Sequence, residues 1–593
     1  MLSSTATPAK QRTRNLGRVA IGGSLLAASG GGTLALLQSP ATAGTIFTVT
    51  NTNASGAGSL DAAIQGANAD PVADTIVFDT SVFDGVTPRT INLTSRLTVT
   101  EAVDIVGPGE NAVTISGGGT LQVFYFYTHG SGPATLSGVT ITNAAQASAI
   151  VVWDTDFTLD HVTVTGSNVV DSTLNFIDGG TGNSLTVSNS TFSNNTTSGN
   201  INNDGGAICA GSNAATNVNI SNSTFTNNTN QSRPGGALGL RGSGDVTITG
   251  STFTGNSSTQ SNPGAGAIFV TNTGNFSISN STLDSNHANN NRGGAIFFAS
   301  SGGVGKTATI ANTTISNNTA NTASGLYFRT QSAVSINNST ITGNQTSFGG
   351  GGAIMVAETG SLTINQSTIT NNTTAGTTPN RGGGGILTSG VGSLSLSGTI
   401  LSGNTSGVSG QADLGLYNAA SLTNLTSNSS LLGTIDSRAT IAGSGNFMSS
   451  TPMLYSLANN GGATWTMLPQ PGSPVIDAGP NPVATFSGNG FDQRGTPNLR
   501  ISNGIADIGA VEVQNGAPPT SSTTTSTTLP TTSTTLDPTA TSTVETESGT
   551  DPTGNLPSTG SDAFPVAVIG VGSLLLGAGV TGFAASRRRN QLR

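Results

Sequence analysis

The sequence predicts an all-β chain, and within that class a right-handed parallel β-helix, from three observations. An apolar residue followed three positions later by asparagine recurs at spacings of 26 to 33 residues. A glycine-rich motif recurs with the same period, and the residues between alternate apolar and polar, which is the period of a β-strand. A unit of about 30 residues made of short strands cannot bury its own apolar face, so successive copies must stack as coils. The apolar anchors are Phe192, Phe225, Phe253, Leu283, Ile315, Ile341, Ile369 and Leu401.

The glycine-rich motif reads Gly205-Gly206-Ala207-Ile208 in its first clear copy. Related copies begin at Gly235, Gly266, Gly293, Gly351 and Gly384. Together with the anchors, they define a repeat region over 121–420, and no part of it has a helical period.

Asparagine occupies the position three residues after every anchor and, in five of the eight repeats, the position three residues before it, where Gly250, Gln366 and Gly398 take its place in the others. Asparagine tolerates left-handed turns, and stacked amides can form hydrogen-bonded ladders between strands. We therefore interpret both sets as structural rows rather than as a ligand site. The first set is Asn195, Asn228, Asn256, Asn286, Asn318, Asn344, Asn372 and Asn404; the second is Asn189, Asn222, Asn280, Asn312 and Asn338.

The first 43 residues have the pattern of a secretory signal peptide. Basic residues between Lys10 and Arg18 precede an apolar stretch, and cleavage is expected between Ala43 and Gly44. An uncleaved anchor is the alternative, which the glycines of the apolar stretch disfavour.

Residues 44–120 are expected to form an N-terminal cap and the first coils. A strand is predicted from Phe47 and another over 74–79. Between them, 59–69 has the pattern of a short amphipathic helix with Ser59 as its N-cap. This block resembles the entry cap of bacterial β-helix surface proteins.

The composition changes again over 421–513, which we expect to close the C-terminal end of the solenoid. The segments around Asp477, Asp492-Gln493-Arg494-Gly495 and Asp507 resemble the region called choice-of-anchor Q, which follows β-helices in secreted proteins. Its acids and Arg494 are interpreted as an ion-pair network, and a metal site at the three aspartates is the alternative.

Residues 514–555 are rich in Ser, Thr and Pro and cannot bury a core, so they are expected to be a disordered stalk. O-glycosylation of this stalk is conceivable from its composition.

Residues 556–593 combine three features in order. Leu556-Pro557-Ser558-Thr559-Gly560 comes first, an apolar run over 566–585 is long enough to span a bilayer, and arginines from Arg587 to Arg593 follow. This order resembles the LPxTG cell-wall sorting signal of Gram-positive surface proteins. The resemblance implies cleavage by a sortase after Thr559, which is then joined to a peptidoglycan precursor, following transient membrane anchoring. The alternative is a plain membrane anchor. The implied location is secreted and wall-anchored.

Charged residues make up 8% of the chain, the net charge is −9 and the pI is near 4.7. A nucleic-acid partner is therefore not expected, because phosphate binding needs a basic face. The single cysteine, Cys209, cannot form an internal disulfide and is interpreted as a small buried side chain.

The repeat motifs resemble those of polymorphic outer-membrane proteins and related β-helix surface proteins, some of which are adhesins. The resemblance implies a surface-display rod that binds a glycan or protein ligand. The chain departs from that family because the sorting signal stands where a membrane β-barrel would follow.

No catalytic constellation and no cofactor motif is visible in the sequence. Trp153, Asp154 and Asp156 form a candidate glycan or calcium site, with a solvated surface as the alternative, and the two aspartates are expected to share a strand face. Arg233, Arg292 and Arg381 precede glycines and are expected to be solvated, with contact to an anionic surface as the alternative. The predicted function is adhesion or surface display without catalysis; the alternatives are a wall-attached polysaccharide lyase or hydrolase and a passive coat.

Overall fold

The computed structural model describes residues 44–514, with gaps at 129, 200–203, 212–214, 260–263, 272–273, 300–304, 331, 359, 380, 390–391 and 418–421. These residues belong to one compact unit, 1–522. The predicted signal peptide with Ala43, the predicted stalk beyond Gln514, the LPSTG pentapeptide and the predicted span over 566–585 lie outside the described residues. Within the described part, the single helix has nine residues, and no helix could cross a bilayer.

The N-terminal block follows the sequence expectation. Strand β1 (Ile46–Val49) leads to helix α1 (Leu60–Asn68), and β2 (Asp74–Phe78) pairs with β1 in parallel. The Ser59 hydroxyl accepts a hydrogen bond from the Ala62 N–H at 3.1 Å, which satisfies one of the free amides at the helix start. The helix buries its apolar face, including Leu60 and Ile64, in the core.

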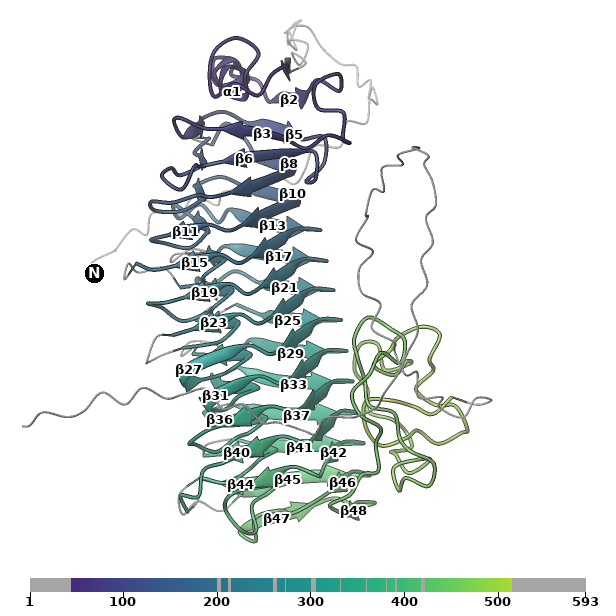
Figure 1. Cartoon of the computed structure of the whole chain (residues 1–593). Helices are drawn as coiled ribbons and strands as arrows, with labels where there is room; N and C mark the ends of the chain where they lie inside the picture. Colours follow the sequence, from purple (N-terminus) through teal and green to yellow (C-terminus); the bar gives the residue numbers. More distant parts are fainter. Residues whose placement is uncertain are drawn as a thin grey trace, which may run out of the picture. The chain divides into compact units, whose positions relative to one another are not determined.

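The strands that follow form three parallel sheets that wind as a solenoid (Figure 1). The largest, sheet A, has 27 strands in two columns that share β8 and β10. Its first column is β1, β2, β5 (Val103–Val106), β8 (Ala134–Thr142), β10 (Phe157–Thr165), β13 (Ser184–Ser188), β17 (Asn217–Ser221), β21 (Val246–Thr249), β25 (Phe276–Ser279), β29 (Thr307–Ala311), β33 (Ala333–Asn337), β37 (Ser361–Asn365), β41 (Leu394–Ser397), β45 (Leu422–Asn428) and β47 (Ala439–Ala442).

The second column of sheet A carries the apolar anchors of the sequence repeat, which stack in register from one coil to the next. Besides β8 and β10 it contains β3 (Arg89–Asn92), β6 (Val113–Ser116), β14 (Thr191–Ser193), β18 (Thr224–Thr226), β22 (Thr252–Thr254), β26 (Thr282–Asp284), β30 (Thr314–Ser316), β34 (Thr340–Thr342), β38 (Thr368–Thr370), β42 (Ile400–Leu401), β46 (Leu431–Leu432) and β48 (Phe447–Met448).

Sheets B and C complete each coil. Sheet B contains β4 (Leu97–Val99), β7 (Phe124–Phe126), β9 (Ile150–Trp153), β12 (Leu174–Ile177), β16 (Ile208–Ala210), β20 (Leu238–Leu240), β24 (Ile268–Val270), β28 (Ile296–Phe298), β32 (Leu326–Arg329), β36 (Ile354–Glu358), β40 (Ile386–Thr388) and β44 (Leu414–Leu416). Sheet C contains β11 (Asn168–Val169), β15 (Thr196–Thr197), β19 (Thr229–Asn230), β23 (Ser257–Ser258), β27 (His287–Arg292), β31 (Thr319–Thr322), β35 (Gln345–Thr346), β39 (Thr373–Thr374) and β43 (Thr405–Ser406).

The core lies inside the coils, where one continuous cluster of buried apolar residues extends from Val49 to Leu432. Its most regular part is a stack of aromatic anchors. The rings of Phe192 and Phe225 stack at 5.3 Å between centroids, and those of Phe225 and Phe253 at 4.8 Å. The chain alternates apolar and polar because one face of every strand contributes to this core.

The second set of asparagines makes the bend between the two columns of sheet A. Asn189, Asn222, Asn280, Asn312 and Asn338 all have φ between 45° and 50°, in the left-handed region that asparagine tolerates. His161 has φ 51° at the same place in β10, and the equivalent residue Gly250 has φ 60°. A residue that adopts this conformation is needed here in every coil.

The first set of asparagines forms a buried row of amides inside the next bend, here called the amide row. The Nδ2 group of Asn228 donates to the Asn256 Oδ1 atom at 3.0 Å and to the Phe192 carbonyl at 2.9 Å. Its own Oδ1 atom accepts from the Nδ2 and backbone N–H of Asn195. The pattern repeats through Asn404, whose Nδ2 donates to the Asp413 carboxylate at 2.8 Å.

The paired glycines are required by the close stacking of the coils. Gly235 has φ 81°, which a residue with a side chain rarely adopts. A Cβ atom added to Gly236 would lie well inside van der Waals distance of the Gly266 carbonyl and of the Ser257 backbone. The same conflict arises at Gly206 with the Gly236 carbonyl, so the motif marks a row where backbone packs on backbone.

The residues after β48, here called the closing segment (450–513), do not lie at the end of the solenoid, where the sequence led us to expect them. They pack along the second column of sheet A (Figure 1). The hydroxyl of Thr314 donates to the Trp465 carbonyl at 2.6 Å, and that of Thr340 to the Gln493 Oε1 atom at 2.6 Å. The Ala510 N–H donates to the Thr368 hydroxyl at 3.0 Å. Outward-facing threonines of the repeat therefore bind this segment.

Candidate functional site

A buried charge network holds the closing segment together. Arg494 donates to the Asp492 carboxylate at 2.6 Å, and Arg500, which is 1% exposed, donates to the carbonyls of Gly509 and Ala510. The Asp507 carboxylate accepts from the N–H groups of Asp477 and Val513. Asp492 thus binds an arginine, and Asp507 binds backbone amides. Within the described residues, no three His, Cys, Asp or Glu side chains are arranged to hold a metal ion.

Glu512 makes the stability of this network depend on pH. Burial, and then the neighbouring Asp507 carboxylate, raise the pKa of Glu512 from 4.5 to about 7. Its contribution is fully present below pH 4.5 and is lost as the pH rises through 7, because the fold favours the protonated form. We expect the free energy of unfolding to fall by roughly 2 kcal/mol over this window.

Urea denaturation at steps from pH 4.5 to 7.5 measures this effect. Burial also raises the pKa of Asp507, which gives a change of the same sign. The comparison with Glu512→Gln therefore isolates the contribution of Glu512. The free energy of unfolding of the variant should depend much less on pH, even if the substitution also changes its stability by a constant amount at every pH. Equal slopes in both proteins would contradict the assignment.

The network positions a turn that carries Trp465. Ala458 and Thr466 exchange backbone hydrogen bonds at 3.0 and 2.9 Å, which closes the turn. Gln493 donates to the hydroxyls of Thr464 and Thr314 at 2.9 Å each, so the turn is tied to strand β30. The Trp465 side chain remains 55% exposed although its backbone is fixed on both sides.

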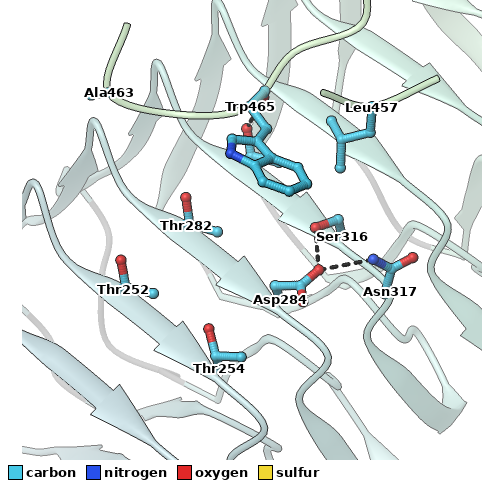
Figure 2. A pocket seen from close by; sticks show the side chains of 10 residues that line it. Thr252, Thr254, Thr282, Asp284, Ser316, Asn317, Leu457, Ala463 and Trp465 are labelled. Carbon is cyan, nitrogen blue, oxygen red and sulfur yellow. Dashed lines mark hydrogen bonds between the residues drawn. The ribbon is translucent and has the colours of Figure 1, made fainter. Parts of the chain in front are cut away.

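Trp465 overhangs a cavity of about 390 Å³, here called the Trp465 pocket (Figure 2). Leu457 and Ala463 line it from the closing segment. Its floor consists of polar side chains from three consecutive strands of sheet A and the turn after them. These floor residues are Thr252, Thr254, Thr282, Asp284, Thr314, Ser316 and Asn317.

The floor is partly ordered by its own hydrogen bonds. The Asp284 Oδ1 atom accepts from the Ser316 hydroxyl at 2.6 Å and from the Asn317 amide at 2.9 Å, as Figure 2 shows. Its other oxygen accepts from the Ser285 hydroxyl at 2.8 Å. The pocket thus combines one fixed carboxylate, a regular set of hydroxyls and one indole. Such a lining suits a ligand that has an apolar face and many hydroxyl groups.

The expectation that Asp154 and Asp156 share a strand face was wrong. Asp154 has φ 52° in the turn after β9, and Asp156 lies just before β10, so they do not share a strand face. The Asp154 carboxylate accepts from Thr181 and Asn183, and that of Asp156 from the Ser184 hydroxyl and N–H. Both carboxylates therefore tie their coil to the next one.

Trp153 is 43% exposed and belongs to an aromatic group that the sequence analysis missed. Its ring meets that of Tyr127 edge-on, with 6.4 Å between the ring centroids, and the centroids of Tyr127 and Tyr125 are 6.5 Å apart. Aligning the repeats of sheet B would have placed Tyr127 beside Trp153 on adjacent coils.

The three arginines expected to be solvated have specific partners. Arg233 and Arg241 approach the buried Asp204 carboxylate, Arg241 at 2.5 Å. Arg292 lies over the Tyr327 ring and Arg381 over the Tyr417 ring, each at 5.4 Å from the ring centroid.

One comparison with known proteins, the match to a family model, agrees with the fold. A family model described as right handed beta helix region matches residues 266–432. Among curated proteins, no significant match was found. The solved structures similar to this chain include the pectate lyase Pel9A, with 13% identity and a TM-score of 0.29, covering 79% of this chain and 96% of that one. A mannuronic acid specific family 6 polysaccharide lyase from human gut microbiota has 10% identity and a TM-score of 0.27, covering 68% and 91%. The chain therefore contains a right-handed β-helix region.

Proposed function

We propose that this chain is a secreted, wall-anchored adhesin that binds neutral glycans in the Trp465 pocket. The observation that carries the proposal is the overhang of a half-exposed indole above a floor of hydroxyls from three consecutive coils. A pyranose ring offers an apolar face to the indole and hydroxyl groups to the floor. The pocket has only one carboxylate among its lining residues, Asp284, whereas glycoside hydrolysis generally uses two.

The location is part of the same proposal. It is supported by the LPSTG pentapeptide, the apolar run and the terminal arginines of the sequence, with Thr559 as the point of attachment to peptidoglycan. An anchored rod of this kind presents its lateral faces to the surroundings, which is where the Trp465 pocket lies. Attachment is tested by fractionating host cells. The native chain should be released by digestion of the wall, whereas the Thr559→Ala variant should be absent from the wall fraction.

Replacing Trp465 by Ala should weaken binding of neutral oligosaccharides at least about tenfold, since a central tryptophan commonly contributes 2 kcal/mol or more to an interface. The measurement is binding of the full chain to an array of neutral oligosaccharides, followed by titration of those that bind. Trp465→Phe should retain part of the affinity. Thr282→Val, which removes one floor hydroxyl and keeps its shape, should lower the affinity by a smaller factor.

Trp153→Ala is the matched control, because Trp153 is also an exposed tryptophan but lies on sheet B. It should bind like the native chain. If Trp153→Ala loses binding while Trp465→Ala keeps it, the ligand site lies at the aromatic group of sheet B and the proposal is wrong. If no neutral oligosaccharide binds to the native chain or to either variant, a passive coat is the better description of the protein.

A further inference from the structure

Asp74, at the start of strand β2, is a buried acid that uses only one of its two carboxylate oxygens. The Oδ1 atom accepts from the Thr45 N–H at 2.7 Å. The Oδ2 atom is buried and has no hydrogen-bond partner among the described residues, and the residue as a whole is 2% exposed. A buried carboxylate oxygen without a donor is destabilising, because burial removes the water that would otherwise bind it. The second oxygen therefore suits a further donor, and a charged donor forms the strongest bond to it.

Thr45 is held on three sides beside this acid. Its N–H donates to Asp74, its carbonyl accepts from the Thr75 N–H at 3.0 Å, and its hydroxyl donates to the Asp70 Oδ2 atom at 3.0 Å. The nitrogen of Gly44 is separated from that of Thr45 by only two carbon atoms. Fixing Thr45 therefore places the Gly44 nitrogen within reach of the same carboxylate.

Gly44 lies too close to β2 to carry a side chain. A Cβ atom added to Gly44 would overlap the carbonyl oxygen of Ala73, and it would also be close to the Asp74 Cα atom. Both are backbone atoms, which cannot move aside as the end of a flexible side chain can. Glycine is thus the residue that lets the chain approach Asp74 this closely.

The block from Gly44 to Pro88 contains acids and no basic side chain. Its sequence has no Lys, Arg or His, and its acids are Asp61, Asp70, Asp74, Asp79 and Asp84. The first basic residue that follows is Arg89, whose Nε atom donates to the Val82 carbonyl at 3.1 Å. Cleavage between Ala43 and Gly44 would give this block a cation of its own, the α-ammonium group of Gly44.

We propose that Asp74 is the binding site for the α-ammonium group of the mature chain. The Gly44 ammonium donates to the Asp74 Oδ2 atom while the Thr45 N–H stays on Oδ1, so one carboxylate holds two successive backbone nitrogens. Hydrolysis of the bond between Ala43 and Gly44 supplies the group. The Ala43 carbonyl carbon takes the oxygen of water, and the Gly44 nitrogen leaves as an amine that is protonated at neutral pH. The inference rests on the secreted location proposed above, and it makes removal of the signal peptide the step that completes the N-terminal cap.

The test compares two forms of the mature chain, purified in detergent, of which one begins at Gly44 and the other at Thr42. Each is released from a fusion by a protease that leaves no extra residue. The pKa of the α-amino group is obtained from the pH dependence of its reaction with a small acylating reagent, followed by mass spectrometry of the first peptide. An ordinary α-amino group has a pKa of about 7.7 to 8.0.

We expect the pKa of the α-amino group in the Gly44 form to lie at least about one unit above this range, because the carboxylate favours the ammonium form. One unit is a tenfold change in the acid constant. The pKa of the Thr42 form should be ordinary, because its amine is two residues further from Asp74. Other charged side chains on the elements that pack against β1 and β2 are carboxylates, which do not titrate near pH 8; they are Asp61, Asp70, Glu101 and Asp104.

Asp74→Asn in the Gly44 form should return the pKa of the α-amino group to the ordinary range. Asparagine keeps the oxygen that accepts from Thr45, so the strand start is preserved. Asp70→Asn is the matched control, because Asp70 is the other acid bound to Thr45, and it should change the acid constant by less than about twofold. Gly44→Ala keeps an amine but displaces it from Ala73, and its pKa should fall between those of the Gly44 and Thr42 forms.

An ordinary pKa in the Gly44 form would overturn the Asp74 site and leave the proposed secretion untouched. A pKa raised equally in the Thr42 form, or lowered equally by Asp70→Asn, would mean a general effect of the acidic block and would also overturn the site. Mass spectrometry of the chain secreted by host cells is the separate readout for processing, and Gly44 is expected as its first residue. Another first residue would overturn the inference for the natural chain, and an uncleaved chain would contradict the proposed secretion as well.

Discussion

Replacing Asn228 by Ala is expected to lower the free energy of unfolding by about 3 to 5 kcal/mol. Asn228 is fully buried, and its amide donates to Asn256 and to the Phe192 carbonyl while accepting from Asn195. The substitution removes the acceptor of the Asn195 backbone N–H and of one Asn195 amide hydrogen, and it removes a donor from the Phe192 carbonyl. Each buried group that loses its partner costs about 1 to 3 kcal/mol. The substitution also opens a small cavity in the amide row.

Asn227→Gly is the matched control, because Asn227 is the neighbour of Asn228 but lies exposed at φ 54°. Glycine adopts that conformation freely, so the control should stay within about 0.5 kcal/mol of the native chain. Urea denaturation followed by circular dichroism measures both variants, and hydrogen exchange shows which coils open first. Equal stability of the two variants would mean that the amide row contributes little.

Gly236→Ala is expected to lower the free energy of unfolding by a similar amount, because it adds atoms to a closely packed place, whereas Asn228→Ala removes them. The added methyl group would overlap the Gly266 carbonyl and the Ser257 backbone of the next coil, and neither is a flexible side chain that can move aside. Overpacking of this kind commonly costs 1 to 3 kcal/mol, and here we expect about 3 kcal/mol or more because backbone must shift. The yield of folded protein should fall together with the stability.

Gly490→Ala provides the comparison. An added Cβ atom at Gly490 meets no atom within 4 Å, and its φ is not in the left-handed region. This variant should be as stable as the native chain or slightly more so, because alanine restricts the unfolded chain. If Gly236→Ala unfolds at the same urea concentration as Gly490→Ala, the coils are not as closely stacked as the structure indicates.

The solenoid was predictable from the sequence because every coil repeats the same physical demands. The anchors of sheet A recur in every coil of the repeat, and the left-handed asparagines and paired glycines recur in most of them, so one copy explains the rest. The N-terminal helix was predictable for a different reason, since its cap and its apolar face are local features.

The Trp465 pocket could not be predicted in this way. It exists because Trp465 approaches Thr314, which is 151 residues earlier in the chain, and no period connects the two. The threonines of the floor have the same pattern in coils that bind the closing segment and in coils that do not. Burial distinguishes them: Thr314 is 1% exposed, whereas Thr252 and Thr282 are only partly buried.

The two arginine–tyrosine contacts lie between these two cases. Arg292 and Tyr327 are 35 residues apart, about one repeat, as are Arg381 and Tyr417 at 36. Aligning the repeats would have placed each arginine one coil before its tyrosine. The sequence analysis did not find these partners, because it considered each arginine within its own coil only; Arg292 is nevertheless exposed, as expected.

The amide row also gives the solenoid an electrical direction. Each amide from Asn195 to Asn372 donates from its NH₂ group to the amide oxygen of the following coil, so the local dipoles add as they do along an α-helix. The positive end of the row meets the Asp413 carboxylate, which accepts from Asn404 and from the Thr434 N–H. An ionised carboxylate has no hydrogen to donate onward. Asp413 therefore ends the amide row with a hydrogen-bond acceptor at its positive end.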